Sequence, residues 1–586
     1  MREKFLKGIP VSSGIGIGKV FLYKRDLPHV PERVINEDEI LKEISRFRSV
    51  INKVEKELSD LYQKVREEMG SDIADLIEFQ ILLLKDEEIL SRVEKFIQEK
   101  KWDGAFSYYR VIQDYRESLA NSSLPFIRER ETDIADCAYR VLRSLLGDEK
   151  TFLSNWHTTE DVILFAFDLT PTEVAILNKE KVRGIALGRG GKSGHVAIMA
   201  KAKEIPAVDG IWDLMRDEYQ NRTAILDGKR GVVIINPNEK RIAQYQREIA
   251  EEKKMKSIYL MERESECVTR DGKYIDISAN IEFIGEVEKA KEYGAKGIGL
   301  FRTEYLFFSR RRIPSEEEQL FFYEEVAKKM KPYPVIIRTF DLGGDKVIPG
   351  YTELNPFLGW RGIRIFLEKR ELLRTQIRAI MRAGAEHKNL KIMFPMISTL
   401  EEVQEIKREI SQVKAELEAK GIPFDPEVEL GIMIETPSSA LLAEKIAPLV
   451  SFFSIGSNDL TQYTLACARD NERVSYLYDP LHPTVIRLYK ETIAAARKYG
   501  IWVGACGEIA SEVLGIVLLV GLGIDELSMV PAKIPEAKRI IRQLEWRKTQ
   551  EWSEKALSLA TAKGVRRFLI REIRKNLPDL AEGLNE

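Results

Sequence analysis

The sequence predicts a multidomain α/β protein whose second half is a (β/α)8 barrel. Three observations carry this prediction. The chain has 586 residues, too many for a single hydrophobic core, so several domains of roughly 100–200 residues are expected. From about residue 33 to residue 148 the composition is helical, with apolar residues three and four apart. Residues 265–586 alternate short apolar runs with helical segments, which is the pattern of a TIM barrel.

Residues 1–25 and 149–237 are predicted to form one small α/β domain. The glycine-rich stretch from Gly14 to Val20 precedes an apolar run and indicates a strand-turn-strand opening. Later short apolar runs, separated by turns and brief helices, cover residues 162–166, 185–187, 224–226 and 232–235.

Residues 26–148 are predicted to form a helical bundle inserted into that α/β domain. A heptad-like seam indicates one long packed helix, followed by helices near residues 76–84, 87–100, 105–120 and 134–146. The seam consists of Ile40, Ile44, Phe47, Ile51, Val54, Leu58, Leu61 and Val65. The bundle is either a structural cap or a helical face for a partner protein, and its sequence alone leaves both open.

The second half is separated from the first by a predicted linker helix at residues 238–264, which is highly charged and has no wide apolar face. Residues 265–586 then form the predicted barrel. Its eight candidate strands are Ile275–Ala279, Gly297–Phe301, Val335–Ile337, Ile392–Phe394, Gly431–Ile434, Phe452–Ile455, Trp502–Ala505 and Glu526–Met529.

Composition limits the possible partners. The net charge of −2 argues against a general nucleic-acid binder. No apolar run reaches the roughly 18 residues that suggest a membrane span, and the N-terminus has no apolar signal core. The four cysteines are widely spaced, which favours reduced thiols over a disulfide framework. We therefore expect a cytoplasmic protein without membrane insertion.

A glycine-rich turn, Gly188 to Ala200, contains His195 between an apolar run and a helix start. Three interpretations compete. The turn is a plain corner with a partly buried histidine, or an imperfect P-loop at Gly191–Ser193 in which Ala186 breaks the pattern. Alternatively, the helix N-terminus attracts a phosphate and His195 accepts a phosphoryl group. The local sequence leaves all three open.

Charged residues follow the predicted barrel strands, at the end where barrel enzymes carry their active sites. Four arginines are the first group, and their guanidinium groups match a phosphate or a carboxylate: Arg302, Arg338, Arg361 and Arg469. Their convergence predicts a multiply charged anionic guest, since they repel one another otherwise. Glu435 and Asp459, from neighbouring strands, offer the oxygen ligands that Mg²⁺ takes. Cys506 is either a buried small hydrophobe or a proton donor, because an ordinary thiol is mostly protonated at neutral pH.

Nearly the whole chain resembles Enzyme I of the bacterial phosphotransferase system, a phosphoenolpyruvate-protein phosphotransferase of the PEP-utilising enzyme family. The resemblance rests on ordered motifs: Asp168-Leu-Thr-Pro, Gly190-Gly-Lys-Ser-Gly-His195, Ile205-Pro-Ala-Val, Gly297-Ile-Gly-Leu-Phe-Arg-Thr-Glu304, Arg338-Thr-Phe-Asp-Leu-Gly-Gly-Asp-Lys346, Asn355-Pro-Phe-Leu-Gly-Trp-Arg361, Met393-Phe-Pro-Met396, Ile434-Glu-Thr-Pro, Ser454-Ile-Gly-Ser-Asn-Asp-Leu-Thr-Gln-Tyr463 and Cys506-Gly-Glu508.

The resemblance implies an activity: phosphoenolpyruvate phosphorylates His195, which passes the phosphoryl group to the phosphocarrier protein HPr. It also implies roles for other residues. Arg302, Arg338, Asn458, Asp459 and Arg469 bind phosphoenolpyruvate, and Arg361 is a further contact. Glu435 and Asp459 hold Mg²⁺, Cys506 protonates the enolate to pyruvate, and Thr170 orients the histidine ring. The α/β domain becomes a phosphohistidine domain, the helical bundle docks HPr, and the barrel forms a homodimer.

The chain departs from the family pattern in four places. Ser193 and Gly194 stand where the family usually has Thr-Ser, and Lys201 stands where it has an arginine. Gln80 replaces a histidine of the carrier-docking helix. This function has two alternatives from other classes, a P-loop-like NTPase and a non-catalytic regulatory paralogue. A P-loop NTPase needs a strand that ends in a metal-binding acid, for which Asp227 is a weak candidate. A non-catalytic regulatory paralogue has no need of the barrel residues, so the presence of Arg302, Glu435, Asp459 and Cys506 argues against it.

Overall fold

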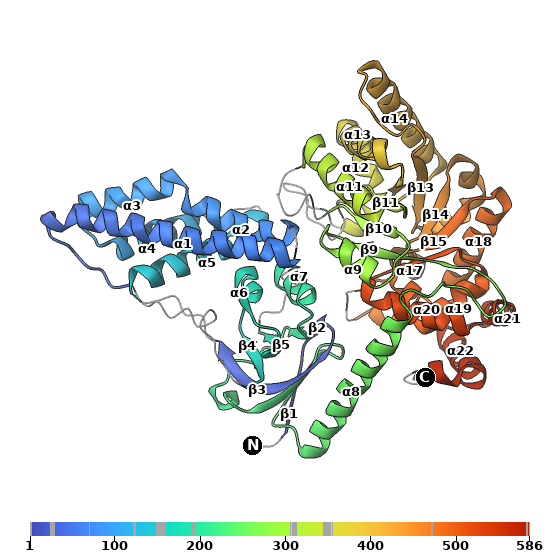
Figure 1. Cartoon of the computed structure of the whole chain (residues 1–586), viewed down its shortest axis with the longest axis horizontal. Helices are drawn as coiled ribbons and strands as arrows, with labels where there is room; N and C mark the ends of the chain where they lie inside the picture. The colour runs from blue at the N-terminus through green and yellow to red at the C-terminus, as the bar shows by residue number, and fades with distance from the viewer. Residues whose placement is uncertain are drawn as a thin grey trace. The chain divides into compact units, whose positions relative to one another are not determined.

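The computed structural model describes residues 3–23, 30–69, 71–120, 125–147, 160–188, 194–304, 306, 313–343, 353, 355–469, 471, 473–581 and 584. The chain divides into two compact units, Met1–Lys254 and Met255–Glu586 (Figure 1). Each unit has its own sheet and hydrophobic cores, so each is described by itself.

The first unit contains an eight-stranded mixed sheet in the order β1-β8-β7-β3-β4-β5-β6-β2. The central strands β3 to β6 run parallel, and the outer neighbours pair antiparallel. The predicted strand-turn-strand opening is confirmed, since Gly14 has a φ of 122° between β2 and β3. The strands are β1 (Lys4–Lys7), β2 (Ile9–Ser12), β3 (Ile15–Tyr23), β4 (Val162–Ala166), β5 (Val182–Leu187), β6 (Ala207–Asp209), β7 (Thr223–Asp227) and β8 (Val232–Ile235).

Strand β4 is buried along its whole length because both faces of the sheet are covered. Leu164 belongs to the core that contains α6 (Pro171–Ile176), α7 (Gly194–Ala202) and the helical bundle. Its neighbours Ile163 and Phe165 pack on the opposite face with Tyr219. One face of the sheet therefore packs against α6 and α7, and this packing positions the start of α7.

The helical bundle lies between β3 and β4 in sequence, although these two strands pair directly in the sheet. Its helices lie alongside one another in Figure 1. The predicted seam of the first helix is confirmed: five of its eight side chains are buried and the others are half-buried. The helices are α1 (Ile40–Met69), α2 (Ser71–Leu84), α3 (Glu87–Lys100), α4 (Gly104–Ala120) and α5 (Pro125–Leu145).

The charged segment predicted as a linker helix forms α8 (Glu239–Met261), and the division between the two units falls within it. All four cysteines are free and buried, as the spacing predicted. Among the described residues, no helix is both long enough and apolar enough to cross a bilayer.

The second unit is a closed barrel of eight parallel strands, in the order β10-β11-β12-β13-β14-β15-β16-β9. Every predicted barrel strand is confirmed to within two residues at either end. The strands are β9 (Asp276–Ile281), β10 (Ile298–Arg302), β11 (Val335–Arg338), β12 (Leu390–Phe394), β13 (Glu429–Ile434), β14 (Phe452–Ile455), β15 (Trp502–Ala505) and β16 (Glu526–Met529).

Helices surround the barrel strands (Figure 1). Ser315 and Thr399 cap α11 and α14, each in a capping box with a glutamate three residues later. The helices are α9 (Glu286–Glu292), α11 (Glu316–Met330), α12 (Ile363–Glu368), α13 (Arg370–His387), α14 (Leu400–Ala419), α15 (Pro437–Leu441), α16 (Ala443–Ile446), α17 (Ser457–Leu465), α18 (Pro483–Tyr499), α19 (Val513–Leu522), α20 (Ile534–Gln543), α21 (Trp546–Leu557), α22 (Ala562–Asn576) and α23 (Pro578–Ala581).

Candidate active site at the mouth of the barrel

The barrel mouth is built on one apolar layer inside the strands. This inner layer consists of Leu300, Ile336, Met393, Met433, Phe452 and Cys506, with Trp502 packed against it. Because inward-facing residues alternate along a strand, the residue two positions after a layer member also faces inward, one step nearer the mouth. Arg302 follows Leu300, Arg338 follows Ile336, and Glu435 follows Met433 in this way.

A buried network of ion pairs crosses the mouth. Arg338 donates from Nη2 to Glu304 at 2.8 Å. Arg361 donates from Nε and Nη2 to the two oxygens of Asp341, at 2.9 and 2.8 Å. The same Nη2 lies 3.1 Å from Oδ2 of Asp459 on α17. The network therefore connects the ends of β10 and β11 with the loop before α12 and with α17.

These contacts correct one inference from the sequence. Arginines at this mouth were expected to repel one another unless an anion bound them, but both buried arginines have carboxylate partners. Burial alone would lower the pKa of Arg361, yet Asp341 and Asp459 raise it above its ordinary value. Burial also opposes the charge of Arg338, whose pKa is raised by Glu304 and Asp341. Both guanidinium groups therefore stay charged.

Glu435 and Asp459, the predicted metal ligands, face this network together. Burial raises the pKa of the Glu435 carboxyl, and the charges of Asp459 and Asp341 raise it further. The Met396 backbone N–H donates to Oε1 of Glu435 at 2.6 Å and orients it. A buried carboxylate held beside a second one is stabilised by a cation, so the donor set fits a hard, oxygen-preferring ion such as Mg²⁺.

Arg302 lies at the same mouth but outside the buried network. Its Nη1 donates to Glu282 at 2.8 Å, and both side chains are about two-fifths exposed, at 41% and 42%. Asn458 makes a reciprocal pair with Glu508 on the next loop: its Nδ2 donates to Oε1 at 3.2 Å, and the Glu508 backbone N–H donates back at 3.0 Å. The Arg469 backbone N–H donates to the Gln462 side chain. The three residues thus lie around the rim.

Cys506 closes the floor of the mouth. Burial raises the pKa of its thiol to about 11, Glu435 acts in the same direction, and Ser454 with the Arg338 and Arg302 charges acts against it. The thiol therefore stays protonated at neutral pH, which suits a proton donor. The sulfur also packs in the inner apolar layer, so the two interpretations drawn from the sequence are compatible.

In the first unit, β5 is followed by α7, and His195 is the second residue of that helix, as the strand-turn-helix prediction requires. The His195 side chain, with Ser193 and most of the glycine turn, lies outside the described residues. Thr170 is buried and caps α6 by accepting from the Glu173 backbone N–H at 3.2 Å. Its predicted contact with the histidine ring stays a prediction.

Two further residues of the first unit bear on the alternatives. Asp227, the acid considered for a P-loop enzyme, accepts from the Lys229 and Arg230 backbone N–H groups and from the Arg230 side chain. It stabilises the turn between β7 and β8. Gln80 is buried and donates to Asp136 at 2.8 Å, so its side chain serves the bundle core.

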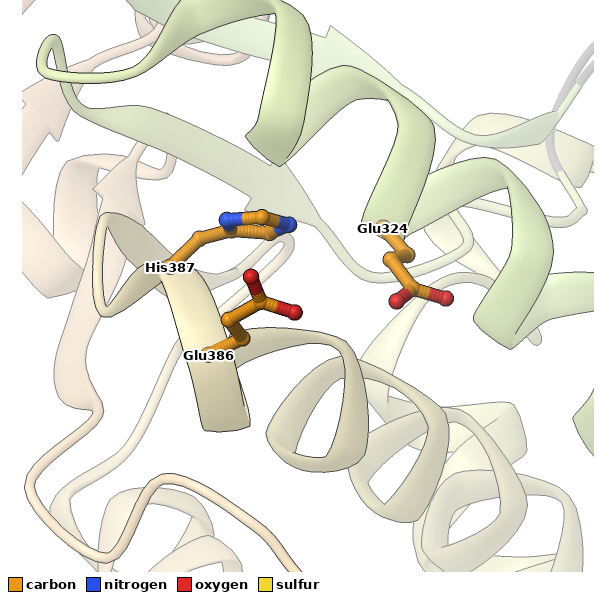
Figure 2. A group of neighbouring side chains, drawn as sticks. All are labelled: Glu324, Glu386 and His387. Atoms are coloured by element: carbon orange, nitrogen blue, oxygen red, sulfur yellow. The ribbon is translucent and has the colours of Figure 1, made fainter.

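A second group that is able to hold a metal ion lies away from the mouth. Glu324 on α11 and Glu386 and His387 at the end of α13 place one ligand atom each within 4.8 Å of one another (Figure 2). Because α13 leads directly into β12, His387 lies at the opposite end of the barrel from the mouth. Both glutamates are exposed, whereas the Nδ1 atom of His387 is buried and has no hydrogen-bond partner among the described residues.

Sequence reasoning missed the acidic residues that hold the arginines. The motifs at the ends of the predicted strands include Glu304, Asp341 and Glu508, but the sequence predicted no function for these three residues. Tyr463 was also missed: its hydroxyl accepts from Arg361 Nη1 at 3.1 Å and donates to the Phe357 carbonyl at 2.5 Å. A buried acid directly after a strand was the available signal for Glu304 and Asp341.

Comparisons with known proteins agree with this architecture. Family models described as PEP-utilising enzyme match the chain in three parts: N-terminal, residues 7–130; mobile domain, residues 158–231; and PEP-binding domain, residues 259–546. The phosphoenolpyruvate-protein phosphotransferase of Staphylococcus carnosus is 39% identical over 577 residues, which is 98% of this chain and 100% of the relative. That of Priestia megaterium is 38% identical over 569 residues, 97% of this chain and 98% of the relative.

The barrel, its charged mouth and the three matching family models define a PEP-utilising enzyme. Since full-length relatives share well over 30% of their residues with it, the chain belongs to the phosphoenolpyruvate-protein phosphotransferase family.

Proposed function

We propose that the chain transfers the phosphoryl group of phosphoenolpyruvate to its own His195 and then to the phosphocarrier protein HPr. Pyruvate is released, and the transfer is the first step of sugar uptake by a phosphotransferase system in the cytoplasm. The observation that carries the proposal is the mouth itself, where two buried arginines and a pair of acidic oxygen donors lie directly above the apolar layer that holds a buried thiol.

The arginines would hold the two anionic groups of phosphoenolpyruvate. Planar guanidinium groups bind phosphate and carboxylate oxygens through paired hydrogen bonds. The Nε of Arg338 is buried and has no hydrogen-bond partner among the described residues, so it keeps a donor for a ligand. Arg302 is half-exposed and its partner Glu282 is as well, so an incoming anion competes with that pair easily. Asn458 and Arg469 would complete the rim.

Glu435 and Asp459 would hold Mg²⁺. When bound, the ion neutralises negative charge on the transferring phosphoryl group. The ionised Glu435 carboxylate is buried and is repelled by Asp459 and Asp341, so a bound cation would stabilise its charge. Arg361, which lies 3.1 Å from Asp459, would fix the orientation of that ligand.

We infer the following reaction for these groups. A ring nitrogen of His195 attacks the phosphorus atom, and the bond from phosphorus to the enol oxygen breaks. The electron pair stays on the enolate, which takes the proton of the Cys506 thiol at its terminal carbon and becomes pyruvate. Because the pKa of this thiol is about 11, the proton is present at neutral pH. Thr170 would orient the histidine ring, the helical bundle would dock HPr, and the barrel would form a homodimer.

The proposal is tested with phosphoenolpyruvate labelled in its phosphoryl group. With Mg²⁺, we expect an acid-labile and base-stable label on the full chain, its loss in His195→Ala, and its passage to cognate HPr. His387→Ala is the matched control, since His387 lies at the far end of the barrel, and should keep the label. Labelling from ATP but not from phosphoenolpyruvate, or a label that survives in His195→Ala, would overturn the proposal.

A further inference from the structure

Asn280 lies near the mouth end of β9 and has no part in the reaction described so far. Its side-chain amide makes three hydrogen bonds. Nδ2 donates to the Cys506 carbonyl at 3.0 Å and to the Ser528 carbonyl at 3.4 Å, and Oδ1 accepts from the Ser528 hydroxyl at 2.6 Å. Because the two carbonyls only accept, the amide nitrogen must face them. The amide thus joins β9 to β16 and to the segment that carries Cys506.

The contact with Cys506 lies where the pairing of β15 has ended. The register between β15 and β16 runs to Ala505 and Leu527, and Cys506 is the next residue. In the barrel order β16 separates β15 from β9, so the Asn280 side chain reaches across β16. On the other side, the Cys506 backbone N–H donates to the Ile455 carbonyl on β14 at 3.1 Å. Both backbone polar groups of Cys506 are therefore held, and with them the direction of its side chain.

Packing holds the groups on either side of this contact. Ser528 is fully buried, and a Cβ added at Gly299 on β10 would overlap its hydroxyl. The same added Cβ would overlap the carboxylate of Glu526, a buried acid two residues earlier on β16. A Cβ at Gly507, directly after the thiol residue, would overlap the Ser457 hydroxyl at the start of α17. The hydroxyl that orients the amide and the chain beyond the thiol thus have little room to shift.

The same end of β9 contacts a group expected to hold the substrate. Glu282 follows Asn280 by two residues and accepts from Arg302 Nη1 at 2.8 Å. The mouth end of β9 therefore connects Arg302, proposed to bind phosphoenolpyruvate, with Cys506, proposed to protonate the enolate. An enolate is planar, so an acid fixed on one side protonates its terminal carbon from that face only. A displacement of about 1 Å in such a pair is enough to slow a reaction by roughly a hundredfold.

We propose that Asn280 is a positioning residue, which holds the Cys506 backbone so that the thiol delivers its proton to one face of the enolate. This inference rests on the proposed function. The chemistry of the step is unchanged: the S–H bond breaks, a C–H bond forms at the terminal carbon of the enolate, and a thiolate remains. Without the amide, the Cys506 carbonyl loses its side-chain donor and the thiol moves away from the enolate. The enolate then takes its proton more slowly, and from water on either face.

The test uses phosphoenolpyruvate with deuterium at one of its two C3 positions, in tritiated water, so that protonation from one face gives a methyl group of a single configuration. The wild-type chain should give one configuration. Asn280→Leu should give both, with kcat for pyruvate formation lowered by about ten- to a hundredfold. Its KM for phosphoenolpyruvate should stay within about twofold, since the arginines keep their partners. The final extent of label on His195 from excess phosphoenolpyruvate should match the wild type.

Two further variants control for damage to the fold. Ser528→Ala keeps the amide donor but removes the hydroxyl that orients it, so it should lose part of the selectivity. Asn389→Leu is the matched control. Asn389 directly precedes β12 at the opposite end of the barrel, and its Nδ2 also donates to two backbone carbonyls, those of Ala327 at 3.0 Å and Tyr333 at 2.8 Å. This variant should be less stable but keep the wild-type kcat and a single methyl configuration.

The outcomes are distinguishable. If the wild-type chain takes no label from phosphoenolpyruvate, the proposed function itself fails. If the wild-type chain is labelled but yields both methyl configurations, or if Asn280→Leu keeps the wild-type kcat and a single configuration, the positioning role is refuted. Loss of selectivity to the same extent in Asn389→Leu would indicate a generally distorted barrel, and would also overturn the inference.

Discussion

The buried network at the mouth allows a matched comparison of two arginine–carboxylate pairs in one site. Asp341→Asn removes the charge that holds Arg361, where the side chains are 4% and 1% exposed. Glu282→Gln removes the partner of Arg302, where both side chains are about two-fifths exposed. Shape is nearly conserved in both variants, so the difference between them reports the effect of burial.

The expected magnitudes differ several-fold. Leaving a buried charge without any partner costs about 3–5 kcal/mol; Arg361 keeps Asp459 at 3.1 Å and an amide oxygen at position 341, so we expect the lower end, about 3 kcal/mol. An exposed pair contributes about 0.2–1 kcal/mol. We therefore expect Asp341→Asn to lower the free energy of unfolding of the barrel by about 3 kcal/mol, and Glu282→Gln by less than about 1 kcal/mol.

Calorimetry of the barrel transition measures the change in the free energy of unfolding. The rate of pyruvate formation from phosphoenolpyruvate measures the change in kcat/KM. A 3 kcal/mol loss in positioning Arg361 corresponds to a decrease of roughly a hundredfold in kcat/KM. Equal losses of stability in the two variants would refute the reasoning from burial. An Asp341→Asn variant with full activity would show that Arg361 does not depend on this partner.

Two further predictions concern the barrel interior. Gln376→Leu should destabilise the barrel by about 1–3 kcal/mol in calorimetry, because the buried Phe340 backbone N–H loses its acceptor, while Tyr323 keeps only its bond to Gln319. Gln412→Leu, on an exposed helix face, should change little. Glu526 has a pKa of about 7 when folded and about 4.3 when unfolded, so the folded state binds its proton more tightly. The stability it confers at low pH should be lost as pH rises from about 4.3 to 7, by roughly 3 kcal/mol, and a wild-type curve no steeper than that of Glu526→Gln would contradict this.

The barrel strands were predictable because each is a short apolar run followed by a helical segment, a pattern that only a few folds share. The end of each strand then points to the mouth, so Arg302, Arg338, Glu435 and Cys506 were found from position alone. The inward alternation along each strand explains why these four side chains meet.

The pairing within the mouth was not predictable in the same way. Arg361 contacts Asp341 because the chain folds back before α12. The sequence of such a loop has no hydrophobic periodicity from which this contact could be predicted. Glu526 was missed for another reason: it stands in an ordinary strand run, and its neighbours Gly299 and Gly504 come from other strands. Only the closed barrel brings that carboxyl and those glycines into one layer.

The position of the helical bundle in the chain sets an order on the folding of the first unit. Strands β1, β2 and β3 pair only with β8, β6, β4 and β7, all of which follow residue 160. While the chain is being synthesised, the bundle helices can pack through local contacts before any of these strands finds a partner. Strands β1 to β3 therefore stay unpaired until the later strands have been synthesised. A chain that stops before β4 can form the bundle helices but not this sheet.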